Sequence, residues 1–210
     1  MAEEYKFCFL DLETTGHEPL RRVGDSLVIW HEIIDIGALL VDQTDFSVFG
    51  TFSEKVIPEH PERCLPNLIN HYPERAARGE WNNALSIEAA LNKFLNFIEA
   101  HADNAVVPGG QNWFFDWSFF SPAFAWCGIP ENVWGKRIHY ARFDTRSMAI
   151  QELLKPGERY NPDEFSLRNG RLLERLGIVP EPEVHEGING ARKAFEVFEK
   201  LRELRVLRGF

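Results

Sequence analysis

The sequence contains little cysteine, and its three cysteines cannot build a disulfide framework. Cys8, Cys64 and Cys127 lie far apart, are odd in number and form no CxxC pair. We therefore expect reduced thiols that pack as small buried hydrophobes. This argues against a disulfide-stabilised scaffold and favours a cytoplasmic protein.

Long hydrophobic runs are also missing. No apolar stretch reaches the length of a membrane-crossing helix, and the opening MAEEYK lacks the basic-then-apolar pattern of a secretory signal. The composition, with 44% hydrophobic and 26% charged residues over 210 positions, is that of an ordinary globular protein. We expect one domain spanning residues 1–210, in the cytoplasm and without a membrane partner.

Positive charge is scarce as well, since the formal net charge is -9. A protein that coats DNA is usually basic, because neutralised phosphates dominate its affinity. An acidic chain can still act on nucleic acid where the contact is local or where metal ions cover its own acids. The charge therefore argues against long nonspecific tracts and leaves short ends as substrates.

The hydrophobic pattern predicts strands that are followed by alternating strands and helices. Strands are expected at 5–12, 32–42, 47–57, 105–110 and 137–143, and helices at 86–102, 116–127, 145–154, 165–177 and 188–204. Short polar turns between the first three strands favour an antiparallel meander. The segment 58–84 is expected to be a loop with one short helix, and 178–184 a proline-rich loop. This order indicates an α/β or α+β sheet covered by helices.

The first strand ends in two acids, in the stretch FCFLDLETTG. Successive side chains of a strand point to opposite faces, so Asp11 and Glu13 share one face and Leu12 points into the core. Two carboxylates on one face repel each other unless solvent, a proton or a cation relieves them. A hard cation such as Mg²⁺ or Mn²⁺ prefers these oxygen ligands. A solvated strand end is the alternative, and for these two acids alone it is favoured.

Two further residues add to this pattern. Asp116 stands inside the aromatic run GGQNWFFDWSFF, where a buried acid needs a partner. It is also a candidate cap of the helix that follows, and the two roles are compatible. His185 stands at the junction of the proline-rich loop and the last helix, where a histidine is either structural or a general base near neutral pH.

Taken together, the motif from Phe9 to Gly16, the stretch from Asn112 to Asp116, and His185 resemble the DEDD exonucleases. The similarity is to the histidine (DEDDh, DnaQ-like) subgroup and covers nearly the whole chain. It implies an α/β (α+β), ribonuclease-H-like fold, with a five-stranded mixed sheet flanked by helices on both sides.

The resemblance also implies a 3′→5′ exonuclease that hydrolyses phosphodiester bonds with two Mg²⁺ or Mn²⁺ ions and releases nucleoside 5′-monophosphates. Asp11 would touch both ions, Glu13 would support the first, and Asp116 would hold the second. His185 would take the proton from the attacking water. Relatives of this kind are often dimers, so a homodimer is a further expectation.

The sequence departs from the family pattern at Gly190. The last motif reads His-x-Ala-x-x-Asp in the family, and here it reads His185-Glu186-Gly187-Ile188-Asn189-Gly190. One account is an enzyme with a weakened first metal site, completed by water, Glu186 or Asn189. A second is an inactive pseudo-exonuclease that binds nucleic acid or protein. In a third, Gly190 is an altered residue in this sequence. We hypothesise that Asp11→Ala abolishes any activity and that Gly190→Asp raises it.

The substrate is expected to be a single-stranded 3′ end of DNA or RNA. The densest basic stretch holds Lys136, Arg137, His139, Arg142 and Arg146, and it is either a phosphate track or a solvated face with internal ion pairs. Our candidate substrate-binding residues are Thr14, Thr15, Asn112, Phe115 and Arg142. Asp144 is interpreted as a helix cap and not as a metal ligand.

Overall fold

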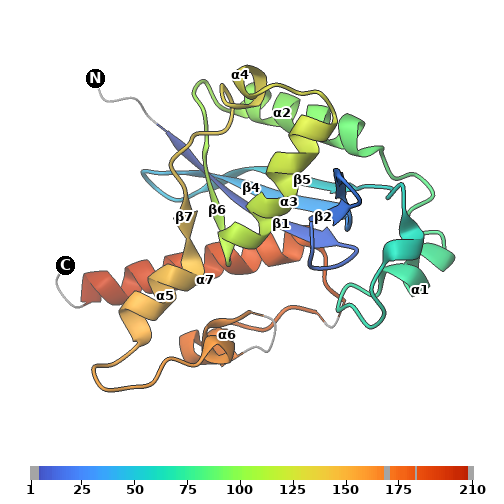
Figure 1. Cartoon of the computed structure of the whole chain (residues 1–210). Coiled ribbons are helices and arrows are strands. Elements are labelled where there is room, and N and C mark those ends of the chain that lie inside the picture. The colour runs from blue at the N-terminus through green and yellow to red at the C-terminus, as the bar shows by residue number, and fades with distance from the viewer. Residues whose placement is uncertain (1–4, 168–170, 183, 208–210) are drawn as a thin grey trace.

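The computed structural model describes residues 5–167, 171–182 and 184–207. Its centre is a five-stranded mixed sheet in the order β5-β4-β1-β6-β7, and a two-stranded sheet is formed by β2 and β3 (Figure 1). The strands are β1 (Lys6–Thr14), β2 (Leu20–Val23), β3 (Ser26–Ile29), β4 (Ile33–Asp42), β5 (Val48–Lys55), β6 (Val107–Gly110) and β7 (Phe143–Asp144).

The first part of the central sheet is the predicted meander. Strand β1 pairs antiparallel with β4, and β4 pairs antiparallel with β5. Strands β6 and β7 then add in parallel beside β1. The β2–β3 hairpin inserted after β1 was not predicted, although the sequence holds a turn signal at Gly24, whose φ of 60° suits a tight hairpin turn.

Seven α-helices accompany these strands in the described part of the chain. They are α1 (Tyr72–Ala77), α2 (Ile87–His101), α3 (Trp113–Trp126), α4 (Glu131–Trp134), α5 (Thr145–Leu153), α6 (Arg171–Leu176) and α7 (Gly187–Leu207), with 3-10 turns at Pro61–Arg63 and Pro162–Phe165. Helix α2 has the predicted serine cap, because the side chain of Ser86 accepts a hydrogen bond from the backbone of Ala89. None of the helices in these ranges has both the length and the apolar character of a membrane span.

Helices cover both faces of the central sheet. Alternate β1 residues such as Leu10 and Leu12 belong to one core cluster, with side chains of α2 and α3. Phe9, which precedes Leu10 and points to the other face of the sheet, belongs to a second cluster with α7. Figure 1 shows α7 along one side of the sheet and α2 and α3 on the other. Full burial of a side chain such as Phe9 contributes about 1.5–3 kcal/mol, so both layers stabilise β1. The predicted α/β sheet with helices on both sides is confirmed.

Several predicted boundaries were wrong. Helix α3 begins at Trp113 and not at 116, so Asp116 lies inside its first turn and does not cap it. The strand predicted at 137–143 is reduced to Phe143–Asp144, because β7 is an edge strand of which only these two residues pair with β6. The helix predicted at 165–177 is α6 (Arg171–Leu176), preceded by the 3-10 turn at Pro162–Phe165. Residues 168–170 of that prediction lie outside the described residues.

The cysteine prediction holds in part. All three thiols are free, but only Cys8 is buried, whereas Cys64 and Cys127 are half-buried.

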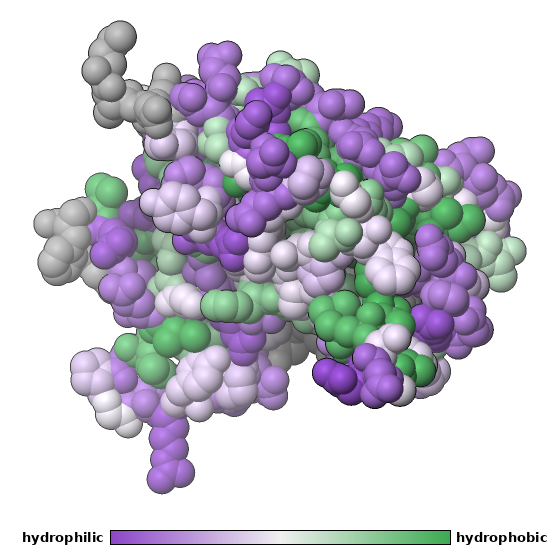
Figure 2. Space-filling view, turned by 45° about the horizontal axis from the view of Figure 1, so that its top comes forward, coloured by the Kyte–Doolittle hydropathy of each residue, from purple (hydrophilic) through white to green (hydrophobic). Residues whose placement is uncertain are grey.

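On the face shown in Figure 2, hydrophilic residues cover much of the surface and smaller hydrophobic areas interrupt them. Large exposed apolar side chains include Phe114 and Tyr140, which are 84% and 85% exposed.

Helix α7 begins directly against the sheet. A Cβ atom added to Gly37 of β4 would overlap the backbone of Gly187 and Ile188. A Cβ atom on Gly187 would in turn lie 2.7 Å from the backbone nitrogen of Gly37 and 2.8 Å from the carbonyl oxygen of Asp11. Two glycines therefore allow a close backbone approach that fixes the start of α7 beside the end of β1.

Candidate active site

The two acids of β1 lie on one side of the strand, as predicted. Asp11 and Glu13 both line a pocket at the end of the strand, while the Leu12 side chain is 4% exposed and packs in the core. Glu13 is itself 9% exposed. The alternation of the strand thus places two carboxyl groups in a pocket where little solvent can relieve their repulsion.

Asp116 brings a third carboxyl group from α3. It is 2% exposed, and its Oδ1 accepts a hydrogen bond of 3.0 Å from the backbone nitrogen of Leu12. This bond ties the first turn of α3 to β1 between the two strand acids. The other Asp116 oxygen has no such tie to β1, and Asp116 lines the same pocket as Asp11 and Glu13.

Asp144 is a helix cap, as interpreted from the sequence. Its carboxylate accepts a hydrogen bond of 3.0 Å from the backbone of Ser147, at the start of α5. Its Oδ1 also accepts hydrogen bonds from the backbone nitrogens of Asn112 and Trp113, at 2.7 and 3.3 Å. Asp144 therefore caps two helices at once and holds the beginning of α3, the helix that carries Asp116.

Burial and mutual repulsion raise the pKa values of these acids. The pKa values of Asp11 and Asp116 are well above their usual range, first because of burial and then because of neighbouring carboxylates. Burial raises the pKa of Glu13 to about 7, although a hydrogen bond from Asn70 lowers it. Such a group of acids strongly favours a bound proton or cation.

The donor chemistry of the pocket fits a hard divalent cation. Mg²⁺ and Mn²⁺ prefer carboxylate oxygens, which Asp11, Glu13 and Asp116 supply. The raised pKa values of these three acids mean that a proton or a cation stabilises them. Among the residues described, no three His, Cys, Asp or Glu side chains are already arranged to hold a metal ion. The donors thus share one pocket of about 280 Å³ without yet being gathered around one point.

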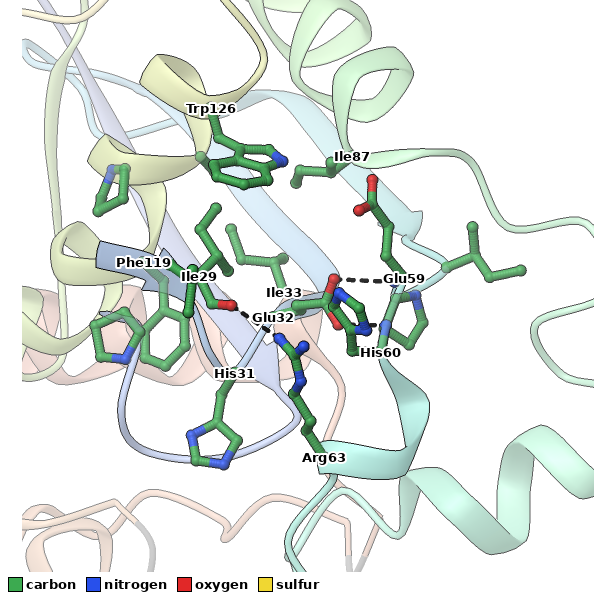
Figure 3. A pocket seen from close by; sticks show the side chains of 16 residues that line it. Ile29, His31, Glu32, Ile33, Glu59, His60, Arg63, Ile87, Phe119 and Trp126 are labelled. Carbon is green, nitrogen blue, oxygen red and sulfur yellow. Dashed lines mark hydrogen bonds between the residues drawn. The ribbon is translucent and has the colours of Figure 1, made fainter. Parts of the chain in front are cut away.

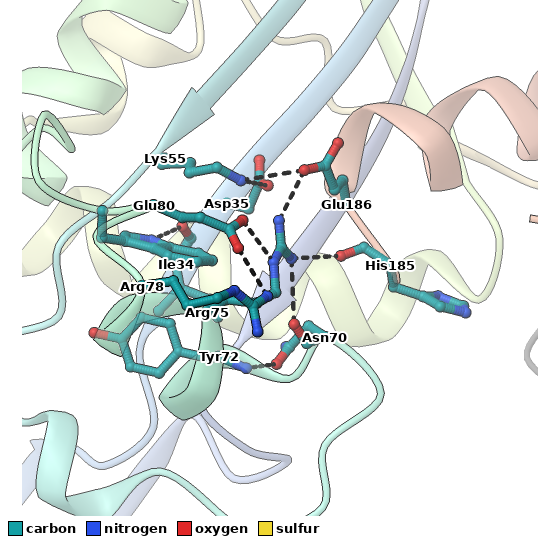
Figure 4. A network of polar contacts seen from close by, with 11 residues as sticks. Ile34, Asp35, Lys55, Asn70, Tyr72, Arg75, Arg78, Glu80, His185 and Glu186 are labelled. Atoms are coloured by element: carbon teal, nitrogen blue, oxygen red, sulfur yellow. Dashed lines mark hydrogen bonds and ion pairs between the residues drawn. The ribbon is translucent and has the colours of Figure 1, made fainter. Parts of the chain in front are cut away.

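His185 lies in the same pocket, just before α7. Its backbone carbonyl accepts a hydrogen bond of 3.2 Å from Arg75, and in Figure 4 its imidazole points away from the surrounding polar network. Arg75 is 3% exposed and also forms ion pairs of 2.8 Å with Glu80 and Glu186. A buried arginine of α1 thus fixes the backbone that presents His185 to the pocket.

Several site residues were not found from the sequence. Asn70 donates hydrogen bonds of 3.0 Å to Glu13 Oε2 and to the Thr14 carbonyl, and so orients the second acid of β1. Glu181 lines the pocket from the proline-rich loop. Arg146 of α5 lines it too, and it belongs to the basic stretch that the sequence offered as a phosphate track. Asn70 and Arg75 belong to the segment 58–84, predicted to be a loop with one short helix, and the sequence gave no signal for their roles. An acid four residues before His185 was a weak signal for Glu181.

The candidate substrate-binding residues fall into two groups. Thr14, Asn112 and Phe115 line the pocket. Thr15 does not line it, because its side chain is buried and its hydroxyl accepts a hydrogen bond of 2.8 Å from the backbone of Glu32. Arg142 also lies outside the lining, exposed, with its guanidinium 3.8 Å from the centre of the Trp117 ring.

Gly190 faces the first acid of β1. A Cβ atom at this position would lie 2.9 Å or less from all three atoms of the Asp11 carboxyl group. Helix α7 therefore offers no ligand there, and the Asp11 carboxyl group uses that space. Glu186 is no substitute, because it pairs with Arg75 at 2.8 Å and Lys55 at 3.4 Å and does not line the pocket. Asn189 does not line it either.

A second pocket has a different character (Figure 3). Its wall is largely apolar and includes Ile87, Phe119 and Trp126. The Glu32 carboxylate at its edge already accepts hydrogen bonds of 2.9 and 2.8 Å from the backbone nitrogens of Glu59 and His60. Its two acids, Glu32 and Glu59, are not buried, unlike Glu13 and Asp116 in the pocket at the end of β1.

The fold resembles that of solved exonucleases. A 3′-exonuclease that recognises the 3′ end of the histone mRNA stem-loop superposes with a TM-score of 0.67 at 14% identity, over 96% of this chain and 64% of that one. The nuclease domain of 3′hExo, a DEDDh family member bound to rAMP, gives a TM-score of 0.64 at 14% identity, over 97% and 94%. E. coli exonuclease I in complex with a dT13 oligonucleotide gives 0.66 at 18% identity, over 98% and 42%.

These similarities define the class of fold. The sheet and its flanking helices form the ribonuclease-H-like α/β fold expected from the sequence, and the chain is structurally similar to exonucleases. It spans 64% of the length of the first of these proteins and less than half of exonuclease I. No protein-family model matches the sequence, and a comparison with curated proteins also finds no match.

Proposed function

We propose that the protein is a divalent-cation-dependent 3′→5′ exonuclease that trims single-stranded ends of DNA or RNA and releases nucleoside 5′-monophosphates. The observation that carries this proposal is the group of three acids, the half-buried Asp11 and the buried Glu13 and Asp116, that share one pocket with His185. The fold supports it, since the structurally similar proteins are exonucleases. Those proteins are described with a histone mRNA stem-loop, rAMP and dT13, which are nucleic acids or a nucleotide.

The three acids would hold Mg²⁺ or Mn²⁺. When bound, such ions supply positive charge that stabilises the phosphodiester oxygens during hydrolysis. The hydrogen bond from Leu12 orients the Asp116 carboxylate, and the hydrogen bond from Asn70 orients the Glu13 carboxylate. Both carboxylates would therefore keep their orientation when no ion is bound. Preorganised carboxylates need little rearrangement during the reaction.

His185 would act as the general base that accepts the proton of the attacking water. Arg75 holds the backbone of His185 through a hydrogen bond to its carbonyl. This contact fixes the position from which the imidazole extends into the pocket. The end of the substrate strand would lie against Thr14, Asn112 and Phe115, which line the pocket, with the Phe115 ring available for stacking on a base. Arg146 lines the same pocket and would balance the phosphate charge.

The first test is a trimming assay on a 5′-labelled single-stranded oligonucleotide in Mg²⁺ or Mn²⁺. We expect a ladder that shortens from the 3′ end, loss of the ladder in EDTA, and a fall in rate of about 10³-fold or more for Asp11→Ala, the size typical of a lost catalytic group. Asp103→Ala, which changes an exposed loop acid, is the matched control and should keep the wild-type rate. An unchanged rate in Asp11→Ala would show that the activity lies elsewhere or in a contaminant.

A further inference from the structure

Glu181 is a buried acid that none of the roles above uses. It belongs to the loop before α7, yet its side chain is only 6% exposed. It lines the same pocket as Asp11, Glu13 and Asp116. Its negative charge raises the pKa values of both Asp11 and Glu13, so it lies close enough to act on both strand acids.

The Glu181 carboxylate has an unsatisfied oxygen. Its Oε2 is buried and accepts no hydrogen bond. His185 Nδ1 lies 3.1 Å from this oxygen, which is an ion-pair distance, but the two groups are not aligned as a hydrogen bond. A buried carboxylate oxygen without a hydrogen-bond donor is costly. A cation in the pocket would remove that cost.

We propose that Glu181 is the fourth carboxylate of the divalent-cation site, supplied by the loop before α7 in place of a ligand from α7 itself. This inference rests on the proposed function, since it assumes the same ion. The chemical class of the ligand is a hard divalent cation, Mg²⁺ or Mn²⁺, which takes carboxylate oxygens.

The packing of α7 explains why the fourth acid comes from the loop. At Gly190 the helix lies so close to β1 that the Asp11 carboxyl group occupies the place of a Cβ atom. Two residues that precede the helix, Glu181 and His185, line the pocket instead, and Glu181 Oε2 lies 3.1 Å from His185 Nδ1. The charge that α7 lacks is therefore present within the same pocket, from a residue nine positions earlier in the chain.

The test measures Mn²⁺ binding directly, by the loss of the free-ion signal in electron paramagnetic resonance. Glu181→Gln keeps the size of the side chain and removes its charge, and we expect its dissociation constant for Mn²⁺ to rise about tenfold or more. Glu203→Gln, at an exposed glutamate of α7 that pairs with Lys200, is the matched control and should stay within about twofold of wild type. Circular dichroism of each variant shows that it is folded.

Two further variants separate the possible failures. If Asp11→Asn loses Mn²⁺ and Glu181→Gln keeps wild-type affinity, the cation site of the proposed function stands and the role of Glu181 is refuted. The same holds if Glu181→Gln slows trimming without changing Mn²⁺ affinity, because the residue then only orients His185. If the wild-type protein binds no Mn²⁺, the proposed function itself fails. Recovery of Mn²⁺ affinity by Gly190→Asp in the Glu181→Gln background would support the inference, because both positions would then supply the same ligand.

Discussion

Gly190 has no side chain, and this lets the Asp11 carboxyl group lie directly against the beginning of α7. All three carboxyl atoms would lie within 2.9 Å of a Cβ atom placed there. These atoms are the end of the Asp11 side chain, which can rotate. A new side chain at position 190 would therefore displace the Asp11 carboxyl group and not the backbone. The position therefore controls both where the first acid points and how many acids the pocket holds.

We expect Gly190→Asp to destabilise the metal-free protein and to strengthen its response to metal. Another carboxylate beside Asp11 adds repulsion, which we expect to lower the free energy of unfolding by about 1–3 kcal/mol in EDTA. In Mn²⁺ the added ligand should raise the melting temperature more than in wild type, and the trimming rate should rise. Thermal unfolding with and without Mn²⁺ measures the first two effects.

Gly190→Ala is the control for this prediction. It adds the Cβ atom and displaces Asp11 in the same way, but it brings no ligand. The metal response of the alanine variant should therefore not exceed that of wild type. Equal responses from the alanine and aspartate variants would show that position 190 acts through packing alone.

At the scale of elements, the junction of β4 with α7 positions much of the site. Gly37 and Gly187 let the two backbones touch, so α7 starts beside the end of β1 and His185 enters the pocket just before it. Arg75 of α1 adds a second anchor, through a hydrogen bond to the His185 carbonyl and an ion pair with Glu186. The geometry of the pocket thus depends on contacts between segments that are distant in sequence.

Gly37→Ala should separate these two elements. The new Cβ atom would overlap the backbone of Gly187 and Ile188, which cannot move aside as a side-chain end can. We expect the free energy of unfolding to fall by about 1–3 kcal/mol or more, and the trimming rate to fall with it as His185 is displaced. Urea unfolding and the trimming assay measure both.

Thr51→Ala, on the exposed surface of β5 in the same sheet, should change stability by less than about 0.5 kcal/mol. A Gly37→Ala variant as stable as this control would mean that α7 can shift along the sheet without loss, contrary to the packing described.

The sequence was informative about some of these elements and silent about others, for physical reasons. Strand alternation placed Asp11 and Glu13 on one face, and local capping chemistry identified Ser86 and Asp144 as helix caps. The roles of Asn70 and Arg75 depend on long-range contacts that no local pattern encodes. Asp116 lines the same pocket as Asp11 and Glu13, but the prediction that it caps the helix was wrong, since the backbone of Asn112 and Trp113 is held by Asp144 instead.

At the scale of the whole molecule, the chain carries a formal net charge of -9 and gathers four acids in one pocket. Burial raises the pKa values of Glu13 and Glu181 to about 7, and those of Asp11 and Asp116 lie well above their usual range. The folded protein therefore holds protons that the unfolded chain has already released between about pH 4.5 and pH 7. Stability must fall as pH rises through this window, because the folded state then binds more protons than the unfolded state.

We expect the melting temperature in EDTA to decrease from pH 5 to pH 8, when measured by circular dichroism. One such shifted carboxyl group corresponds to about 3 kcal/mol, and the groups are not additive because they share the same repulsion. Excess Mn²⁺ should restore several degrees at pH 8 and much less at pH 5, where protons compete for the same carboxylates. Glu13→Gln, which removes one of these titrating groups, should flatten the pH dependence in EDTA. A wild-type melting temperature that rises from pH 5 to pH 8 without metal would contradict the view that the four acids repel one another in the folded protein.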